Sequence, residues 1–260
     1  MKHRRPHFFA RILLLAPLAC GAQTQPAAEI KVQERQILGA SQLRGHHAPR
    51  GTSTHEITPT LVHFSGSGWP RDAILKAAGA AADILGQCGV RLAQAELMLV
   101  DAPQQYQYFQ TLVSRELARA LQPGKPTVYF VTDTRQQPAF DAEAIGRGNS
   151  KTRPELADSV WVTRATRDPG IALAHELAHV LMDSGEHVEE PGNLMREDTA
   201  PGNTRLSAAQ CVQLRQTGEK NGILRKVAGS PGRTRPGVTG SQRGTSRSPT
   251  ATSPPPTTSA

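Results

Sequence analysis

Two histidines stand four positions apart in the mostly apolar segment His175-Glu176-Leu177-Ala178-His179. Asp168 is a suitable N-cap before this segment, and Pro169 suits the first turn of a helix. A spacing of four places both imidazoles about one turn apart on one helix face, aimed at one point. Two histidines on a solvated helix face would share this spacing, but both of these interrupt an apolar run. The segment therefore predicts a helix that presents two imidazoles together.

The residue types in this segment indicate metal chemistry. Two imidazoles one turn apart are typical zinc ligands, and the HExxH pattern places a glutamate directly after the first of them. Glu176 is offset by about 100 degrees around the helix from His175. It can therefore reach a water beside the metal instead of acting as a ligand. We expect Zn²⁺ as the cofactor and Glu176 as a general base.

A catalytic zinc site needs a third protein ligand and one open position. His187, eight residues after His179, is the candidate. We expect a turn at Ser184-Gly185, with Gly185 in the left-handed conformation that ends many helices. Asp183, one turn beyond His179, and Glu197, further along the chain, remain alternative third ligands.

Residues after His187 carry a family resemblance. Pro191 stands at the fourth position after His187 and Met195 at the eighth. In this order the segment resembles the metzincin zinc endopeptidases, most closely their matrixin-like members. The resemblance implies zinc ligation by His175, His179 and His187, catalysis by Glu176, and a Met-turn at Met195. It also implies a zincin-like α+β fold with a mixed sheet, an active-site helix and a C-terminal helix.

The chain also departs from the family pattern. The family places its third histidine six residues after the second, with a glycine between them at the third position. Here the gap is eight and Met182 occupies the glycine position. The tyrosine that some metzincins place after the methionine is absent, so polarisation of the substrate carbonyl would fall to the zinc. Ala144-Ile145-Gly146 resembles the family segment that pairs with an extended substrate.

The remaining segments between residues 56 and 228 have the pattern of one compact α+β domain with a mixed sheet. Apolar spacing predicts a helix over 71–86 and another whose face starts at Tyr108 and Phe109 and continues through Leu112 to Leu121. Strands are expected at 60–64, 97–100, 128–131 and 159–163. His63, on the first of these strands, is expected to be a structural histidine.

The first 22 residues are typical of a secretory signal, because a basic start precedes the apolar run from Ile12 to Ala19 and small residues follow. Cleavage after Ala22 would release a soluble protein, and lipid attachment at Cys20 is the alternative. The apolar run is too short to cross a bilayer. We therefore expect an exported protein, secreted or periplasmic, without a transmembrane helix.

The other segments outside the domain have a low apolar content. Gly, Pro, Ser and Thr make up 24 of the 32 residues from 229 to 260. Such a composition cannot offset the entropy cost of ordering, so a disordered tail is expected. Residues 23–55 are interpreted as a linker or short pro-segment.

The net charge of +8 comes from the two ends of the chain. Residues 1–22 and 229–260 each carry four basic residues and no acid, so residues 23–228 are neutral. A nucleic-acid-binding domain should carry its positive charge on the fold itself. With only 4% aromatic residues, base-stacking platforms are also disfavoured. We expect no nucleic-acid partner.

Cysteine usage agrees with export. Once Cys20 leaves with the signal or is lipidated, Cys88 and Cys211 remain, an even number. In an oxidising compartment a disulfide between them is expected. It would join the end of the 71–86 helix to a last helix whose start at Ser207 has capping-box spacing.

These features favour an exported zinc endopeptidase that acts on polypeptide substrates. One alternative keeps the zinc chemistry but acts on another amide, such as a cell-wall peptide cross-link. Another is a binding module that holds the metal without turnover. Glu176 argues against the last alternative, because a purely structural zinc site does not need it.

Overall fold

The computed structural model describes residues 29–43, 53–135, 144–147 and 153–227. The chain divides into two units, residues 1–227 and 228–260, and every described element belongs to the first. The helices are α1 (Arg71–Gly86), α2 (Thr111–Leu121), α3 (Pro169–Met182) and α4 (Ala208–Lys220), with short 3₁₀ turns at Gln104–Gln107 and Pro154–Leu156. The strands are β1 (Lys31–Gly39), β2 (His55–Ile57), β3 (Thr60–Phe64), β4 (Val90–Leu92), β5 (Gln94–Asp101), β6 (Tyr108–Phe109), β7 (Thr127–Val131), β8 (Asp133–Thr134), β9 (Ala144–Arg147), β10 (Ser159–Thr163) and β11 (Arg225–Lys226).

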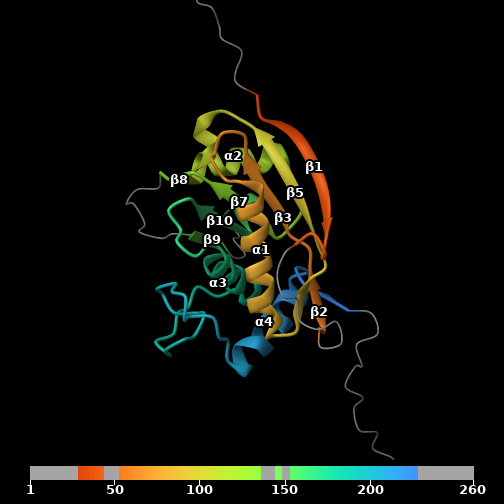
Figure 1. Cartoon of the computed structure of the whole chain (residues 1–260), viewed down its shortest axis with the longest axis vertical. Coiled ribbons are helices and arrows are strands. Elements are labelled where there is room, and N and C mark those ends of the chain that lie inside the picture. The colour runs from red at the N-terminus through yellow and green to blue at the C-terminus, as the bar shows by residue number, and fades with distance from the viewer. Residues whose placement is uncertain (1–28, 44–52, 136–143, 148–152, 228–260) are drawn as a thin grey trace, which may run out of the picture. The chain divides into compact units, whose positions relative to one another are not determined.

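The main sheet has six strands in the order β1-β5-β3-β7-β10-β9 (Figure 1). The four inner strands β5, β3, β7 and β10 are parallel to their neighbours among themselves. The two edge strands, β1 and β9, pair in the antiparallel sense. The expected mixed sheet is therefore confirmed. Two smaller sheets, β11-β2-β4 and β6-β8, complete the strand pairing of the described residues.

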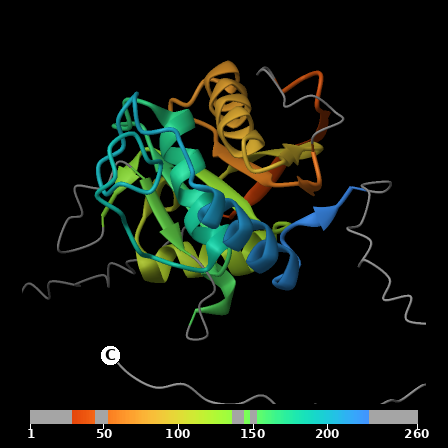
Figure 2. The ribbon, with the colours of Figure 1, turned by 90° about the horizontal axis from the view of Figure 1, so that it is seen from below.

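Helices cover both faces of the main sheet, and Figure 2 shows α1 and α2 on opposite sides of it. Alternate residues of each inner strand divide between two apolar clusters. Val160 and Val162 of β10 pack in the cluster that contains the side chains of α1, α3 and α4. Trp161 packs in the cluster that contains α2, where its ring stacks on Tyr129 at 3.9 Å between centroids. Because both faces are covered, every residue of β10 is buried.

Most predicted elements are present. The strands at 60–64 and 159–163 and the helix at 71–86 have the expected bounds, while those at 97–100 and 128–131 extend to 94–101 and 127–131. The overall class, α+β with a mixed sheet, is confirmed. The helix that bears the HExxH segment and the C-terminal helix are both present.

The prediction of a helical face that begins at Tyr108 and Phe109 was wrong. These two residues form strand β6, paired with β8, and α2 begins only at Thr111. Phe109 is fully buried against Trp161, whereas Leu112 is 71% exposed. The apolar spacing resembled that of a longer helix because Tyr108 and Phe109, which form a strand, come just before α2 in the sequence.

Residues 31–39 lie in the range interpreted as a linker or pro-segment, and they form β1. This strand pairs with β5 along its whole length, from Lys31 opposite Asp101 to Gly39 opposite Gln94. Leu38 is its only fully buried side chain, and the others are exposed or half-buried. Because main-chain hydrogen bonds hold this edge strand, its side chains carry little apolar pattern, and the strand was not predicted from the sequence. The interpretation of residues 23–55 as a linker or short pro-segment stays a prediction.

The predicted disulfide joins Cys88, just after α1, to Cys211 in the first turn of α4, with the two Cα atoms 4.9 Å apart. The capping box is also present: the Ser207 hydroxyl accepts a hydrogen bond from the Gln210 backbone N–H, and the Gln210 side chain accepts one from the Ser207 N–H. Disulfides are typical of proteins outside the cytoplasm. Among the described helices, none combines the length and apolarity that a membrane span requires.

Candidate metal site

Helix α3 positions the first two histidines. Pro169 occupies its first turn as expected, and Asp168 is the N-cap residue, although its side chain makes no capping hydrogen bond. Gly170 lets the start of α3 approach α1 closely, since a Cβ there would stand 2.5 Å from the Ala80 Cβ. Twelve of the fourteen helix residues are buried, so α3 is held on nearly all sides. The orientation of its histidines follows from that packing.

The helix ends differently from the prediction. Asp183, with φ of 49°, takes the left-handed conformation, and Gly185 does not have a positive φ. Asp is among the residues that tolerate this region, because its short polar side chain can bond locally. The Ser184 N–H then donates to the His179 carbonyl at 3.2 Å. The chain therefore leaves the helix before Gly185, and the following residues return His187 to α3.

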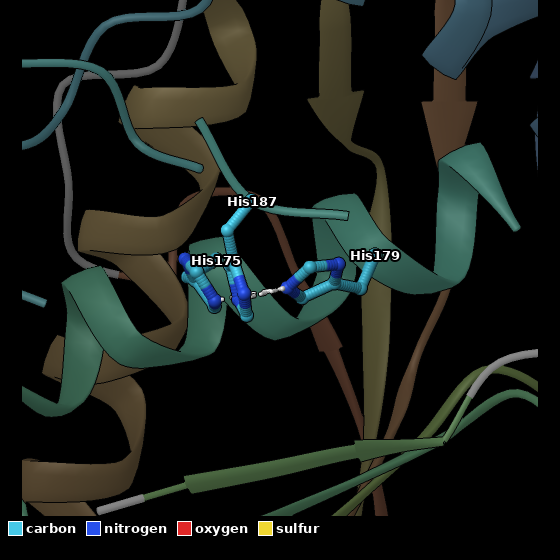
Figure 3. Close-up of side chains that lie close together, drawn as sticks. All are labelled: His175, His179 and His187. Atoms are coloured by element: carbon cyan, nitrogen blue, oxygen red, sulfur yellow. Dashed lines mark hydrogen bonds between the residues drawn. The ribbon is translucent and has the colours of Figure 1, made fainter. Parts of the chain in front are cut away.

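The three histidines converge on one point, as Figure 3 shows. The Nε2 atom of His179 lies 2.9 Å from Nε2 of His175 and 3.1 Å from Nε2 of His187. His175 is 3% exposed and His179 is 9% exposed, whereas His187 lies at the surface. Two largely buried histidines and one exposed histidine thus form the cluster.

Main-chain carbonyls orient the two helix histidines. His175 Nδ1 donates to the Leu194 carbonyl at 2.7 Å, and His179 Nδ1 donates to the Ser184 carbonyl at 2.6 Å. In a neutral imidazole whose Nδ1 carries the proton, Nε2 has a free lone pair. Both lone pairs therefore face the shared point. Such hydrogen bonds are the usual way in which proteins set the tautomer of a metal-binding histidine.

Burial also keeps these two rings uncharged. Desolvation is the main reason that the pKa of His175 is lowered, and desolvation together with the neighbouring His175 lowers the pKa of His179 to about 4. Both side chains are therefore neutral near pH 7, which is the form that binds metals.

The donor set fits a metal ion. Lone pairs that face each other at about 3 Å repel unless a cation lies between them. Zn–N bonds of about 2.0–2.1 Å in a tetrahedron place ligand nitrogens about 3.3 Å apart, close to the separations found here. The three-histidine cluster thus suggests a bound metal ion.

The alternative third ligands lie outside this cluster. Within the described part of the chain, the one group of His, Cys, Asp and Glu side chains close enough to share a metal consists of His175, His179 and His187. Asp183 and Glu197 are exposed and do not belong to it. Glu176 follows His175 on α3 and is 9% exposed.

The segment from Val188 to Met195 folds back beneath the site. The Val188 N–H donates to the Met195 carbonyl at 2.9 Å, and the Leu194 N–H donates to the Arg205 carbonyl at 2.7 Å. Met195 is 1% exposed and belongs to the same apolar cluster as Leu177 of α3. The predicted Met-turn residue therefore lies in the apolar core that also contains side chains of the histidine helix.

The other predicted site residues lie elsewhere. Residues 144–147 form β9, an edge strand of the main sheet that packs near α3. His63 is half-buried on β3, where desolvation and the nearby Arg71 lower its pKa, and it is not part of the histidine cluster.

Sequence reasoning did not identify the carbonyls of Leu194 and Ser184, because main-chain acceptors leave no sequence signal. It also assigned no role to Asn193. A polar residue directly before the apolar pair Leu194-Met195 could have indicated a side chain that bonds the main chain of this turn.

Comparisons with known proteins give little further information. No protein-family model and no curated protein sequence matches the chain. Among solved structures, the chain is similar to metalloproteinase-II from Bacteroides fragilis, with a TM-score of 0.42 and 16% sequence identity. The similarity covers 69% of this chain and 57% of that chain, so this chain spans little more than half the length of that protein.

Proposed function

We propose that the chain is an exported zinc-dependent endopeptidase. In this proposal His175, His179 and His187 hold the zinc, Glu176 is the general base, and Met195 forms the Met-turn. The observation that supports it best is that Nε2 of His179 lies about 3 Å from Nε2 of His175 and from Nε2 of His187, while the Nδ1 protons of His175 and His179 are donated to carbonyls. A glutamate on the same helix is the remaining part that hydrolysis needs.

Zinc bound to three histidines, with one position open, supplies an electrophile for a carbonyl and acidifies water near neutral pH. The histidines supply neutral nitrogen donors and leave the charge of the ion largely uncompensated. His187 is exposed, which supports the approach of a polypeptide to the site from solvent.

Glu176 moves the proton in this proposal. Its carboxylate accepts a proton from the attacking water and then donates that proton to the amine that leaves after cleavage. The helix offset between Glu176 and His175 separates the carboxylate from the ligand nitrogens. Glu176 can therefore act beside the metal without displacing a histidine.

Strand β9 is the proposed contact for an extended substrate. It is the last strand of the main sheet beside β10, so within the described residues its outer side has no strand partner. A polypeptide could add there as a further strand through main-chain hydrogen bonds, without strong side-chain selection. A peptide on β9 would run close to α3, which carries two of the histidines.

Export is proposed from the two observations that agree with it. The Cys88–Cys211 disulfide favours an oxidising compartment. The signal-like residues 1–22 and the lipid-attachment alternative at Cys20 lie outside the described residues and stay predictions.

The test is the substitution Glu176→Gln, which keeps nearly the same volume but removes the base. Hydrolysis of a broad peptide library should fall by about a hundredfold or more, the usual scale of general-base catalysis, while zinc stays bound. Peptide products are counted by mass spectrometry and zinc by elemental analysis. The matched control is Glu116→Gln, an isosteric change at an exposed acid of α2, on the other face of the main sheet from α3, which should keep both properties.

Two results would overturn the proposal. Zinc-loaded wild-type protein that cleaves no member of the library would favour the non-catalytic binding module. Unchanged hydrolysis in the Glu176→Gln variant would remove Glu176 from the mechanism. Cleavage of cell-wall peptides but not of polypeptides would instead identify the amidase alternative.

A further inference from the structure

The strongest unexplained arrangement lies behind His175. The carbonyl that accepts the His175 Nδ1 proton belongs to Leu194, and the peptide unit between Leu194 and Met195 carries this carbonyl together with the Met195 N–H. A trans peptide unit is planar, with its C=O and N–H pointing in opposite directions. A group that holds the N–H therefore also fixes the direction of the carbonyl.

Asn193 is that group. Its side-chain Oδ1 accepts a hydrogen bond from the Met195 N–H at 2.9 Å. The Leu194–Met195 peptide unit is thus held on one side by Asn193 and on the other by His175. Hydrogen bonds in such a chain polarise one another, so the bond to Asn193 strengthens the acceptor that His175 uses.

The Asn193 side chain is itself fully held. It is 3% exposed, and its Nδ2 donates to Glu190 Oε2 and to Gln210 Oε1, both at 3.1 Å. Gln210 Nε2 donates in return to Asn193 Oδ1 at 3.3 Å. Both donors and both acceptor positions of the amide are therefore used, and the amide has one orientation.

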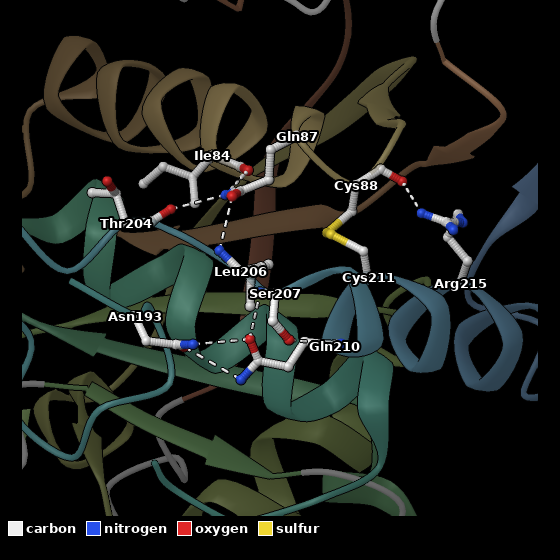
Figure 4. Close-up of a disulfide and its surroundings, with 10 residues drawn as sticks. All are labelled: Ile84, Gln87, Cys88, Asn193, Thr204, Leu206, Ser207, Gln210, Cys211 and Arg215. Carbon is white, nitrogen blue, oxygen red and sulfur yellow. Dashed lines mark hydrogen bonds between the residues drawn. A yellow bond between two sulfur atoms is a disulfide. The ribbon is translucent and has the colours of Figure 1, made fainter. Parts of the chain in front are cut away.

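Gln210 connects this amide to a rigid part of the fold. It is the capping-box residue at the start of α4, and the next residue, Cys211, is joined to Cys88 at the end of α1. Figure 4 shows Asn193 and Gln210 facing each other beside this disulfide. Side-chain contacts therefore fix the position of the Leu194 carbonyl relative to α1 and α4.

We propose that Asn193 is a positioning residue for the metal site, which sets the tautomer and ring direction of His175 by holding the Leu194–Met195 peptide unit. This inference rests on the proposed function, in which His175 binds zinc. Asn193 touches neither the metal ligand atoms nor the substrate. Its effect passes through the peptide unit to His175, and the pair with Gln210 keeps it in place.

The test is Asn193→Ala, compared with Asn203→Ala. Asn203 is a similarly buried asparagine of the same loop, 9% exposed, but its side chain donates to the Asp198 carbonyl and not to the residues that hold the Leu194–Met195 peptide unit. Zn²⁺ affinity is measured by competition with a chromophoric chelator, without any substrate. Loss of a residue that orients a ligand typically costs 10- to 100-fold in metal affinity, and we expect this loss for Asn193→Ala. Asn203→Ala should stay within about twofold, since it leaves that orientation intact.

A spectroscopic measurement separates positioning from general loosening of the loop. Co²⁺ bound to the wild type and to Asn203→Ala should give the same visible absorption bands, whereas Asn193→Ala should shift them because the His175 ring is reoriented. Equal affinity of Asn193→Ala and wild type, or equal losses and equal spectra in the two variants, would overturn the inference.

A second variant keeps the test decisive if Asn193→Ala does not fold. Asn193→Asp combined with Glu190→Gln keeps an acceptor for the Met195 N–H and for Gln210 Nε2, and it reverses the bond between positions 190 and 193 without adding charge. It loses the bond from position 193 to Gln210 Oε1, so this double variant should recover part of the affinity that Asn193→Ala loses, and no recovery in a folded protein would contradict the inference. A wild type that binds no zinc would overturn the proposed function as well, whereas failure of the Asn193 variants alone would leave that function standing.

Discussion

Helix α3 and the loop that follows it, residues 183–207, supply the two halves of the candidate site by different means. His175 and His179 lie one turn apart on a helix that is almost fully buried. His187 comes from an exposed segment whose path depends on main-chain hydrogen bonds within the loop, such as Val188–Met195 and Leu194–Arg205, and on contacts of the loop with Gln87 and with Gln210 of α4. Local periodicity therefore sets the first two nitrogens, and long-range contacts set the third.

The loop is anchored at its far end more strongly than at the site. Near α4 it is held by the disulfide, by the capping box at Ser207, and by the Gln87 side chain, which accepts from the Leu206 N–H and donates to the Thr204 carbonyl, both at 2.8 Å. Figure 4 shows these contacts together. This difference shows that the packing of α3 is enough to position His175 and His179. The loop that carries His187, in contrast, is held in place by contacts with α1 and α4.

The largest expected effect comes from removing the disulfide. The bond spans 123 residues, and in the chain-entropy account a loop of this size contributes about 4 to 5 kcal/mol to stability. The double variant Cys88→Ala with Cys211→Ala should therefore lower the free energy of unfolding by about 2 to 5 kcal/mol, measured by urea titration of the metal-free protein.

Val212→Ala is the control for the disulfide variant, because Val212 is adjacent to Cys211 but 43% exposed. It should change the free energy of unfolding by no more than about 0.5 kcal/mol. If the cysteine variant also lost no more than this, the loop would not depend on its far anchor, and the contrast with α3 would fail.

The next effect concerns His187, which is exposed in the loop half. A four-ligand zinc site binds zinc with a free energy of about 10–16 kcal/mol, so one of the four ligands accounts for roughly 2.5 to 4 kcal/mol. His187→Ala should therefore weaken Zn²⁺ binding by roughly 100- to 1000-fold. The metal-free fold should keep its stability within about 0.5 kcal/mol, because an exposed side chain is removed.

His179→Ala makes the comparison with the helix half. It also removes a nitrogen from the cluster, but it additionally breaks the bond to the Ser184 carbonyl that ties the helix end to the loop. We therefore expect this variant to lose metal-free stability as well as zinc affinity in the same measurements. Unchanged zinc binding in His187→Ala would direct attention back to Asp183 or Glu197 as the third ligand.

The smallest effect is expected for Gln87→Ala. It removes two hydrogen bonds between the end of α1 and residues 204–206, but Gln87 is exposed, so water can replace them. The free energy of unfolding should fall by about 1 kcal/mol, and limited proteolysis after Arg205 should become faster. Gln216→Ala, at an exposed position of α4, is the matched control and should change neither. Equal cleavage rates in the two variants would show that Gln87 does not anchor the loop.

Much of the fold was predictable because its signals are local. Apolar spacing predicted the bounds of α1, since burial of one side of a helix leaves a periodic pattern. The short β-branched run at 159–163 located β10, although both faces of that strand are buried. The prediction failed where main-chain pairing between strands, and not a periodic pattern of apolar side chains, determines the structure. Edge strand β1 is held by its main chain, and β6 placed the apolar pair Tyr108-Phe109 outside the helix they seemed to begin.

The candidate site divides in the same way. By itself, the sequence determined that His175 and His179 share one helix face with Glu176 nearby, because the helix repeat relates residues four positions apart. Only the tertiary structure decided that His187 meets them, that Asp183 ends the helix instead of Gly185, and that the Leu194 carbonyl orients His175. These contacts depend on the path of a loop, and that path is set by residues far away in the sequence, from Gln87 and Cys88 to Gln210 and Cys211.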